Sequence, residues 1–476
     1  MTQKEKQADN FNSTADLTTN TGFESTLSID SKDITRDEKA YNPFEHREVE
    51  HPNSTIGATI HLLKGCLGSG ILAMPSAFKN AGTVVGMIGT ILAGVICTHT
   101  VALVVRSSQE LCVIAKKPSM GFAETCGAAF TYGPKKLQSW GSFVRTVIDY
   151  SMVVTYLSLL CVYTVFIASS VKEAMDGWYP ESDISFQVYC ALCLVPLVLI
   201  CQIRNLKYLV PFSATANMLI VVVFGVTMYY IFIDLPSPKE REMVASVTTW
   251  PLFFSTVIFA MEGIGVVMPV ENEMSHPQKF LGCPGVLNTA MIIVISLYGV
   301  FGFFGYVQFG DAVKGSITLN LPQDQWVAQG AKLLMAVVIY LSFALQFYVP
   351  MEKINRMLAK RKSDKYENVI QIGIRTTLLT IIVAVAVLFP NLELVISLVG
   401  AIFFSTLGLL IPALIDTVHR WDRDLGRWNY ILIKNSIIMI IAVIALVSGS
   451  YVSIVEMIHD KSGGSDTVSQ LNVTLT

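Results

Sequence analysis

Charged residues are scarce in this chain of 476 residues: only 15% are Asp, Glu, Lys or Arg, whereas 52% are hydrophobic and the mean hydropathy is +0.54. An ordinary soluble protein carries more charge and less apolar surface. The formal net charge of -2 gives no basis for binding nucleic acid. The sequence also lacks a Walker loop, a metal-ligand cluster and a nucleophile motif. It therefore predicts an integral membrane protein that is not an enzyme, uses no cofactor or metal and binds no nucleic acid.

The chain also lacks a cleavable signal peptide and the cysteine pattern of a disulfide-rich protein. Its first 50 residues are polar, and the first apolar stretch is long enough to span a bilayer, so we expect the amino end to stay in the cytosol. The nine cysteines lie in apolar segments or in and beside predicted cytosolic loops. We therefore predict no disulfide framework.

Both ends of the chain are predicted to be tails outside the membrane. Residues 1–50 are rich in Ser, Thr, Asn, Asp and Glu, and they bury too little apolar surface to offset the loss of chain entropy. We interpret them as a disordered cytosolic tail for signalling or sorting partners, with a sorting-like pattern at residues 41–44 (YNPF). Residues 456–476 form an extracellular or luminal tail, in which Asn472 heads a glycosylation pattern near the chain end.

Between the tails, residues 51–455 form a predicted all-α transmembrane domain with the lipid bilayer as its solvent. A bilayer-spanning helix needs roughly 20 apolar residues. We count eleven such segments, at residues 55–79, 83–105, 142–171, 185–201, 208–232, 250–270, 284–309, 327–349, 369–389, 393–415 and 430–452.

The basic residues support this count and predict an orientation, because short cytosolic loops collect Lys and Arg. If the amino end is inside, the inner loops hold most of the basic residues. The outer loops then hold only Lys172, Lys239, Arg241, Lys314 and Lys461. An odd number of spans places the carboxyl tail on the opposite side from the amino tail.

Two of the spans carry a glycine-rich interruption beside an ionisable residue. The first reads Gly68-Ser69-Gly70, and the second lies around Glu262 and Gly263, five spans later. Broken backbone at membrane depth survives only where protein or a polar cavity satisfies its amides and carbonyls. Two breaks an odd number of spans apart predict inverted repeats, at residues 55–232 and 250–415, with discontinuous helices one and six and an extra helix at 430–452.

The breaks predict a site for a zwitterion near the midplane. Unwinding exposes amides at the start of one half-helix and carbonyls at the end of another, which form partial positive and negative poles. We expect the substrate carboxylate to bind amides and the ammonium to bind carbonyls. The alternative is that the glycines only allow close helix packing. The predicted substrate-binding residues are Gly68, Ser69, Gly70, Ile71, Phe259, Ala260, Met261 and Gly263.

Three ionisable residues near the breaks are candidates for coupling to protons. A free histidine titrates near pH ~6.5, so His61 suits a proton acceptor that loads in an acidic compartment. Glu262 is an intramembrane carboxylate, either a proton carrier or a counter-ion for Lys64. Lys64 itself is more typical of a supporting cation that snorkels or pairs. An inert, hydrogen-bonded His61 is the alternative interpretation.

The third span adds two further candidates for a gate or a supporting role. Asp149 is an acid inside an apolar segment, and Arg145 one turn earlier is its expected local partner. Tyr156 and neighbouring aromatic residues are expected either to close over a substrate or only to pack.

Several of these patterns together resemble the proton-coupled amino acid transporters of the amino acid/auxin permease family. They are residues 60–65 (IHLLKG), 68–70 (GSG), 79–82 (KNAG), 251–254 (PLFF), Glu262 with 264–267 (IGVV), Pro269, 271–272 (EN), 309–311 (FGD) and 319–322 (LNLP). The resemblance implies an eleven-span fold with broken helices, symport of small neutral amino acids with protons, and a part for His61 in coupling. The chain departs from the family in lacking cysteines in the predicted outer loops. It also has Ser69 and Gly263 where larger residues are commoner in the family.

We therefore expect a proton/amino acid symporter of the plasma membrane or the late endosome and lysosome. A sodium-coupled transporter of the same fold is one alternative, although the eighth span offers few hydroxyls beyond Tyr340 and Ser342. An amino acid sensor that feeds growth signalling with slow transport is another, suggested by the long polar tail. A channel fits the inverted broken helices less well.

Overall fold

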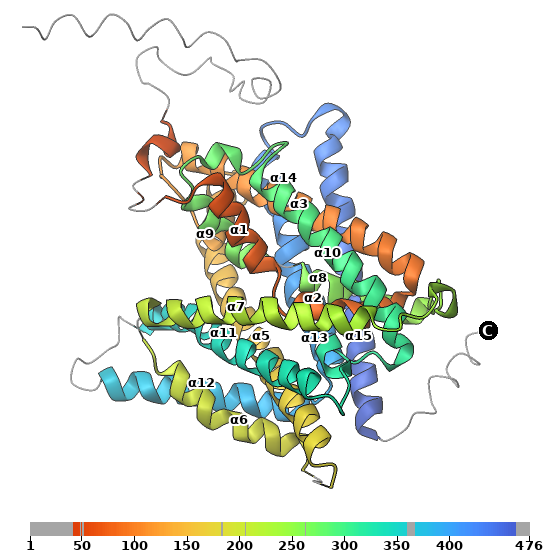
Figure 1. The fold of residues 1–476 in the computed structure, drawn as a ribbon. Coiled ribbons are helices and arrows are strands. Elements are labelled where there is room, and N and C mark those ends of the chain that lie inside the picture. Colours follow the sequence, from red (N-terminus) through yellow and green to blue (C-terminus); the bar gives the residue numbers. More distant parts are fainter. Residues whose placement is uncertain are drawn as a thin grey trace, which may run out of the picture. The chain divides into compact units, whose positions relative to one another are not determined.

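The computed structural model describes residues 41–47, 49, 52–181, 184–204, 206–261, 263–358 and 367–462. The named secondary-structure elements in these ranges are all helices (Figure 1). The long helices are α1 (Thr55–Cys66), α2 (Gly70–Ala81), α3 (Thr83–Ile114), α4 (Phe122–Thr131), α5 (Gly141–Trp178), α6 (Phe186–Cys201), α7 (Leu206–Phe232), α8 (Trp250–Ala260), α9 (Ile264–Asn272), α10 (Val286–Phe309), α11 (Trp326–Leu358), α12 (Glu367–Leu388), α13 (Leu392–Val399), α14 (Ile411–Arg420) and α15 (Tyr430–Ser462).

The expected all-α membrane architecture is confirmed. Within the described residues, nine helical segments are long and apolar enough to cross a membrane, and the bent pair α1 and α2 passes the same test as one span. The remaining predicted span, 185–201, corresponds to α6, an apolar helix of 16 residues. Helix α4 is too short to span a bilayer.

Both predicted interruptions are present. Helices α1 and α2 meet at a bend of 53°, with residues 67–69 outside either helix. Helix α8 ends at Ala260 and α9 begins at Ile264. Glu262, which falls in this second break, lies outside the described residues.

The broken helices pack against each other in opposite directions. The second half of the first, α2, contacts the first half of the other, α8, while α1 contacts α9 (Figure 1). Helix α10 contacts both α1 and α2. The two breaks therefore meet with antiparallel chain directions, which is the relation that inverted repeats require.

The tenth span contains an irregularity that the sequence did not predict. Between α13 and α14 the chain forms a π-helical segment, η10 (Gly400–Leu410). The hydroxyl groups of Ser405 and Thr406 donate hydrogen bonds to the carbonyls of Ala401 and Ile402 four residues earlier. Such side-chain bonds compete with the backbone ladder. Segments of this kind occur often at functional sites.

Candidate functional site

The first break forms because a glycine-rich tripeptide follows a regular helix end. The amide of Leu67 still donates to the carbonyl of Leu63 at 2.7 Å, but the amide of Gly68 turns back to the carbonyl of Cys66 at 2.9 Å. Helix α2 then begins at Gly70 after the buried Ser69, whose side chain makes no capping hydrogen bond. The first amides of α2 have no partner within the helix, so this end carries a partial positive charge.

The second break has a similar construction. The amide of Met261 donates to the carbonyl of Val257 at 2.9 Å, which completes the last turn of α8. After the break, the carbonyl of Gly263 accepts from the amides of both Val266 and Val267 at 2.9 Å. Gly263 thereby caps the start of α9, which gives it a structural role.

Glycine brings the two breaks into backbone contact. A Cβ on Gly70 would lie 2.7 Å from the Cα of Ala260, and one on Gly65 would lie 2.9 Å from Val266 Cγ1. A Cβ on Gly68 would meet no heavy atom within 4 Å. Gly70 therefore acts as a packing residue, whatever further role it has, and its contact with Ala260 places the start of α2 beside the end of α8. Gly65 does the same between α1 and α9.

A tyrosine from a third helix lies between the two breaks. The hydroxyl oxygen of Tyr298 on α10 is 2.5 Å from the carbonyl oxygen of Cys66 and 2.7 Å from that of Ala260. These are the last residues of α1 and α8. Tyr298 is fully buried. Sequence reasoning missed it, because the only available signal was one phenol in an apolar run, and a buried phenol usually finds a hydrogen-bond partner.

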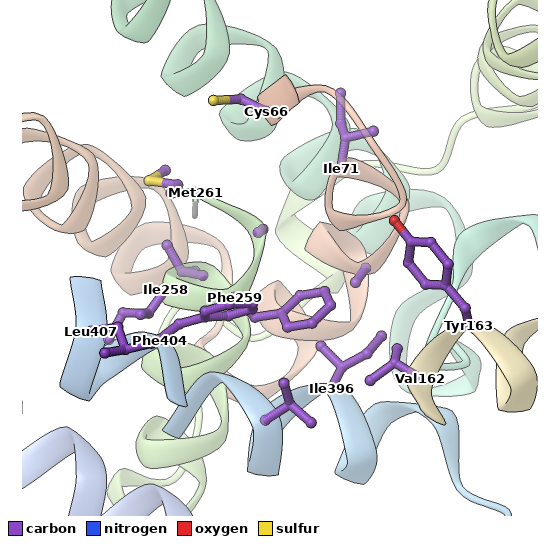
Figure 2. Close-up of a cluster of buried hydrophobic side chains, with 14 of the residues drawn as sticks. Cys66, Ile71, Val162, Tyr163, Ile258, Phe259, Met261, Ile396, Phe404 and Leu407 are labelled. Carbon is purple, nitrogen blue, oxygen red and sulfur yellow. The ribbon is translucent and has the colours of Figure 1, made fainter. Parts of the chain in front are cut away.

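Apolar side chains surround the breaks. Figure 2 shows Ile71, Phe259 and Met261 from the broken helices together with Tyr163 of α5 and Phe404 of η10. The rings of Phe259 and Phe404 lie 5.4 Å apart between centroids. The sequence-predicted residues Ser69, Gly70, Ile71, Phe259, Ala260 and Met261 are thus brought together and buried.

A small cavity adjoins the start of α9. It has a volume of about 30 Å³ and is lined by Met152, Thr155, Tyr156, Leu159, Gly265, Phe404 and Leu407. Tyr156 closes it toward Gly265, whose missing Cβ makes room for the phenol oxygen. Ligand pockets usually have roughly 300–1,000 Å³. A ligand of ordinary size therefore enters this cavity only after side chains or helices have moved.

Two predicted residues lie away from this buried region. The side chains of His61 and Lys64 are exposed on α1, and Lys64 Nζ is 3.3 Å from Ser213 Oγ of α7.

Asp149 forms its ion pair with Lys353 of α11 and not with the expected Arg145. The expectation failed because periodicity along one helix cannot reveal a partner that a later span supplies. Asn472 lies outside the described residues.

Each broken helix is held by an ion pair at the end that lies away from its break, α2 at one end and α9 at the other. Lys79 Nζ, on the last turn of α2, is 2.7 Å from Glu393 Oε2 at the start of α13, and Asn80 donates to the other carboxylate oxygen at 2.7 Å. At the opposite end, Arg47 pairs with Glu271 of α9 at 3.2 Å, with side chains only 5% and 1% exposed. The far ends of α2 and α9 are therefore each held by an ion pair.

A partly buried polar network lies where α3, α14 and α15 meet. His419 Nε2 is 2.8 Å from Glu110 Oε2, and Arg420 contacts both Glu110 and Asp416 at 2.9 Å. Asn435 donates to Asp416 at 2.8 Å. Within the described part of the chain, no group of three or more His, Cys, Asp or Glu residues is placed to hold a metal ion. Arg420 thus bridges the carboxylates of Glu110 on α3 and Asp416 on α14, and the neutral amide of Asn435 links α15 to them.

Comparison with known proteins gives the family of this chain. The profile of the family described as "Transmembrane amino acid transporter protein" matches residues 51–455. The chain is 40% identical over 426 residues to "Proton-coupled amino acid transporter-like protein pathetic" of Drosophila melanogaster, covering 90% of each protein. It is 28% identical to "Vacuolar amino acid transporter 4" of Saccharomyces cerevisiae, covering 62% of this chain and 40% of the yeast protein.

The fold also resembles a solved structure described as the inward-facing conformation of Mhp1. The TM-score is 0.51 at 12% sequence identity, covering 91% of this chain and 95% of the other. At this identity the likeness concerns the fold alone.

Proposed function

Because the chain belongs to the family of transmembrane amino acid transporter proteins, we propose that it is a symporter that carries small neutral amino acids of the glycine, alanine and proline type together with protons. Transport proceeds by alternating access around the two breaks. The observation that carries the proposal is the backbone contact between Gly70 and Ala260, which sets the start of α2 beside the end of α8.

This contact places opposite partial charges close together in an otherwise apolar setting. The start of α2 offers amides at Ser69, Gly70 and Ile71 to a carboxylate, while the ends of α1 and α8 offer carbonyls to an ammonium group. A free amino acid carries both groups on one carbon. The rings of Phe259 and Phe404, 5.4 Å apart between centroids, give this region an apolar wall suited to a small side chain.

The small size of the cavity supports the view that this structure is a closed conformation, which lies between an inward-open and an outward-open one in the proposed cycle. Lys79 with Glu393 closes one end and Arg47 with Glu271 closes the other. Alternating access requires that these contacts break in turn, so that the breaks become accessible from one side at a time.

Proton coupling is assigned to His61 and Glu262. His61 is exposed on α1, within one turn of Lys64, and histidine is the side chain best suited to gain and lose a proton near neutral pH. Glu262 lies in the second break of the sequence. The 40% identity to a proton-coupled transporter-like protein supports coupling to protons over coupling to sodium.

Uptake into liposomes tests the proposal. Vesicles that contain the purified protein should accumulate radiolabelled alanine, glycine or proline faster when the outside is acidic, and a protonophore should abolish the difference. Replacing sodium with choline should change nothing. Uptake that follows sodium and ignores pH would establish the sodium-coupled alternative in place of ours, and vesicles without protein set the background.

Two variants locate the coupling. His61→Ala should flatten the dependence of uptake on external pH, because it removes the group that accepts the proton. Glu262→Gln should reduce uptake even at acidic pH if the charge holds the break in shape. Unchanged pH profiles in both variants would remove these two residues from the coupling step.

We further propose that the amino end is cytosolic and that the protein resides in the plasma membrane or in the late endosome and lysosome. The orientation follows from the distribution of Lys and Arg among the loops. The face with Arg47 and Glu271 is then the cytosolic one, and the face with Lys79 and Glu393 is extracellular or luminal.

A further inference from the structure

A polar cavity lies away from the two breaks, in a part of the fold that the proposed transport site does not use. It has a volume of about 350 Å³, which is large enough for a small ligand. Its walls come from the last turns of α11, the first turns of α12 and the link between α6 and α7, and α6 packs beside α12 (Figure 1). The lining residues are Arg204, Tyr348, Glu352, Asn355, Asn368, Gln371 and Arg375.

Arg375 brings a buried charge to this cavity that the surrounding protein satisfies only in part. The residue is 2% exposed. Its Nη1 donates to the carbonyls of Cys201 and, at 3.2 Å, of Ile203, at the end of α6. Its Nε, on the other edge of the guanidinium fork, has no hydrogen-bond partner among the described residues. A guanidinium binds phosphate well through two parallel hydrogen bonds from one edge of the fork.

A second guanidinium gives the cavity an excess of positive charge. Arg204 is exposed, and its Nη1 donates to Asn368 Oδ1 at 2.6 Å. The described lining has one carboxylate, Glu352, which pairs with Arg356. No carboxylate of the described residues forms an ion pair with Arg204 or Arg375. An anion in the cavity would supply the missing counter-charge.

The lining also offers a hydrogen-bond acceptor. Asn355 Oδ1 is buried and has no hydrogen-bond partner in the described part of the chain. An ionised carboxylate has no hydrogen to donate to this oxygen, whereas a hydroxyl group has one. A ligand that carries both phosphate and hydroxyl groups therefore satisfies this lining better than a simple anion does.

The surroundings of the cavity place it at the edge of the lipid-facing surface. Large apolar side chains are exposed close to it, at Leu199 on α6, Tyr208 on α7 and Ile372 on α12. In sequence, residues 359–366 between α11 and α12 add four Lys or Arg against one Asp. Basic pockets between membrane helices on the cytosolic side bind anionic lipid head groups. The proposed orientation places this cavity on that side.

We propose that this cavity binds a phosphorylated inositol, as the head group of a lipid in the adjoining leaflet or as a soluble inositol phosphate. Arg204 and Arg375 bind the phosphate groups, and Asn355 accepts a hydrogen bond from a ring hydroxyl. The exposed apolar side chains beside the cavity favour the lipid, because they give its acyl chains a surface. The site goes beyond the proposed transport function and does not depend on which amino acid is carried.

Binding to the purified, full-length protein in detergent tests the site. The probes are a short-chain phosphatidylinositol bisphosphate, phosphatidylserine with the same chains, and soluble inositol trisphosphate. The rise of the thermal midpoint with probe concentration gives each Kd. The inositol lipid should bind saturably and at least about ten-fold more tightly than phosphatidylserine. Weaker binding of the soluble probe than of the inositol lipid would assign the site to the membrane, and equal binding would assign it to a soluble inositol phosphate.

Three variants locate the binding in the cavity. Arg204→Gln should weaken binding of the inositol lipid at least about ten-fold, because it removes a charge-assisted hydrogen bond to phosphate. Arg375→Lys keeps the charge and a donor for the end of α6 but loses the fork, and should weaken binding at least about five-fold. Arg427→Gln removes an exposed charge from the same predicted face, and as the matched control it should change the Kd less than about two-fold.

The midpoints without probe show whether each variant folds, and if Arg375→Lys does not, Arg204→Gln decides alone. Three results would overturn the proposal. They are the absence of saturable binding, binding of phosphatidylserine as tight as that of the inositol lipid, and a loss in Arg204→Gln no greater than in Arg427→Gln.

Discussion

At the scale of single residues, the three amino acids of the first break have different tasks. Gly70 touches Ala260 of the facing helix, Ser69 is buried at the start of α2, and Gly68 has free space around the position of a Cβ. A sequence pattern of glycine, serine and glycine gives no sign of this difference. It becomes visible only when the second broken helix is in place.

We expect Gly70→Ala to destabilise the protein and to abolish uptake. The added methyl group would lie 2.7 Å from a backbone atom, so α2 and α8 would have to separate. Overpacking of this kind typically costs about 1–3 kcal/mol. The measurement is the thermal midpoint of the purified protein together with uptake of alanine. Gly68→Ala is the control and should keep a midpoint near that of the unaltered chain; equal losses in both variants would contradict our reading of the contact.

The residues also show how far sequence reasoning reaches. The sequence predicts Ser69, Gly70 and Ala260 as parts of one substrate site, because an interruption at membrane depth has few explanations. The structure brings Gly70 against Ala260 and buries Ser69, and their binding of a substrate stays a prediction. Tyr298 was missed, since a tyrosine in an apolar run usually only packs. The prediction that Arg145 pairs with Asp149 was wrong for a related reason. The actual partner, Lys353, is distant in sequence and close only in the fold.

At the scale of helices, the breaks were predictable and the π-helical segment η10 was not. Glycine beside an ionisable residue interrupts an apolar run in a way that can be recognised in the sequence. In contrast, η10 is built from residues that also suit an ordinary helix, and its distortion accompanies hydroxyl groups at Ser405 and Thr406 that bond backward. The packing of Gly400 against the carbonyl of Ser255 in α8 is likewise invisible before the helices are assembled.

The contact between α2 and α13 gives a prediction at this scale. Glu393→Gln removes the charge that holds Lys79, and for side chains that are partly exposed we expect a cost of about 1–2 kcal/mol, between the values for exposed and buried pairs. The end of the site near α2 should therefore open more often, by about 5- to 30-fold.

Modification of Cys66 measures this opening. The thiol is buried at the end of α1, so a small alkylating reagent reaches it only after the helices separate. It should react correspondingly faster in Glu393→Gln. Glu173→Gln, which breaks the more exposed pair with Lys314, serves as the control. Equal rates in all three proteins would show that the pair does not close this end.

At the scale of the whole molecule, charged contacts at two opposite ends enclose an apolar centre. The contact at the second end is the more deeply buried, with Gln109 donating to Glu271 at 2.8 Å in addition to Arg47. Removal of one partner from a buried pair leaves an uncompensated charge. The two ends are therefore not equivalent in strength.

We expect Glu271→Gln to lower the free energy of unfolding by about 3–5 kcal/mol, because Arg47 would remain buried without a counter-charge. Denaturation of the purified protein followed by fluorescence measures the change. Glu124→Gln breaks the exposed pair with Lys117 at the same end and should cost less than about 1 kcal/mol. A loss in Glu271→Gln no greater than in this control would argue against a buried, structural pair.

The proposed orientation can be tested with the cysteines already present. Of the nine, all within the described residues, Cys283 alone is exposed. Burial raises the pKa of the Cys126 thiol, which therefore stays protonated and unreactive through the neutral range. An impermeant maleimide should label the protein only after selective permeabilisation of the plasma membrane, and Cys283→Ser should abolish the label. Labelling of Cys283 in intact cells would reverse the orientation.

The pair of Arg47 and Glu271 has a consequence for the segment that precedes the first span. Arg47 also donates to the carbonyl of Pro118, and the backbone of Asn53 bonds to Glu273 and Ser275 beyond the end of α9. In the proposed transport cycle, a molecule that binds the chain just before Arg47 would act on the same contacts that have to break for the site to open at this end. By thermodynamic linkage, a molecule that binds this segment more tightly when it is released would favour opening, and opening would raise its affinity by the same factor.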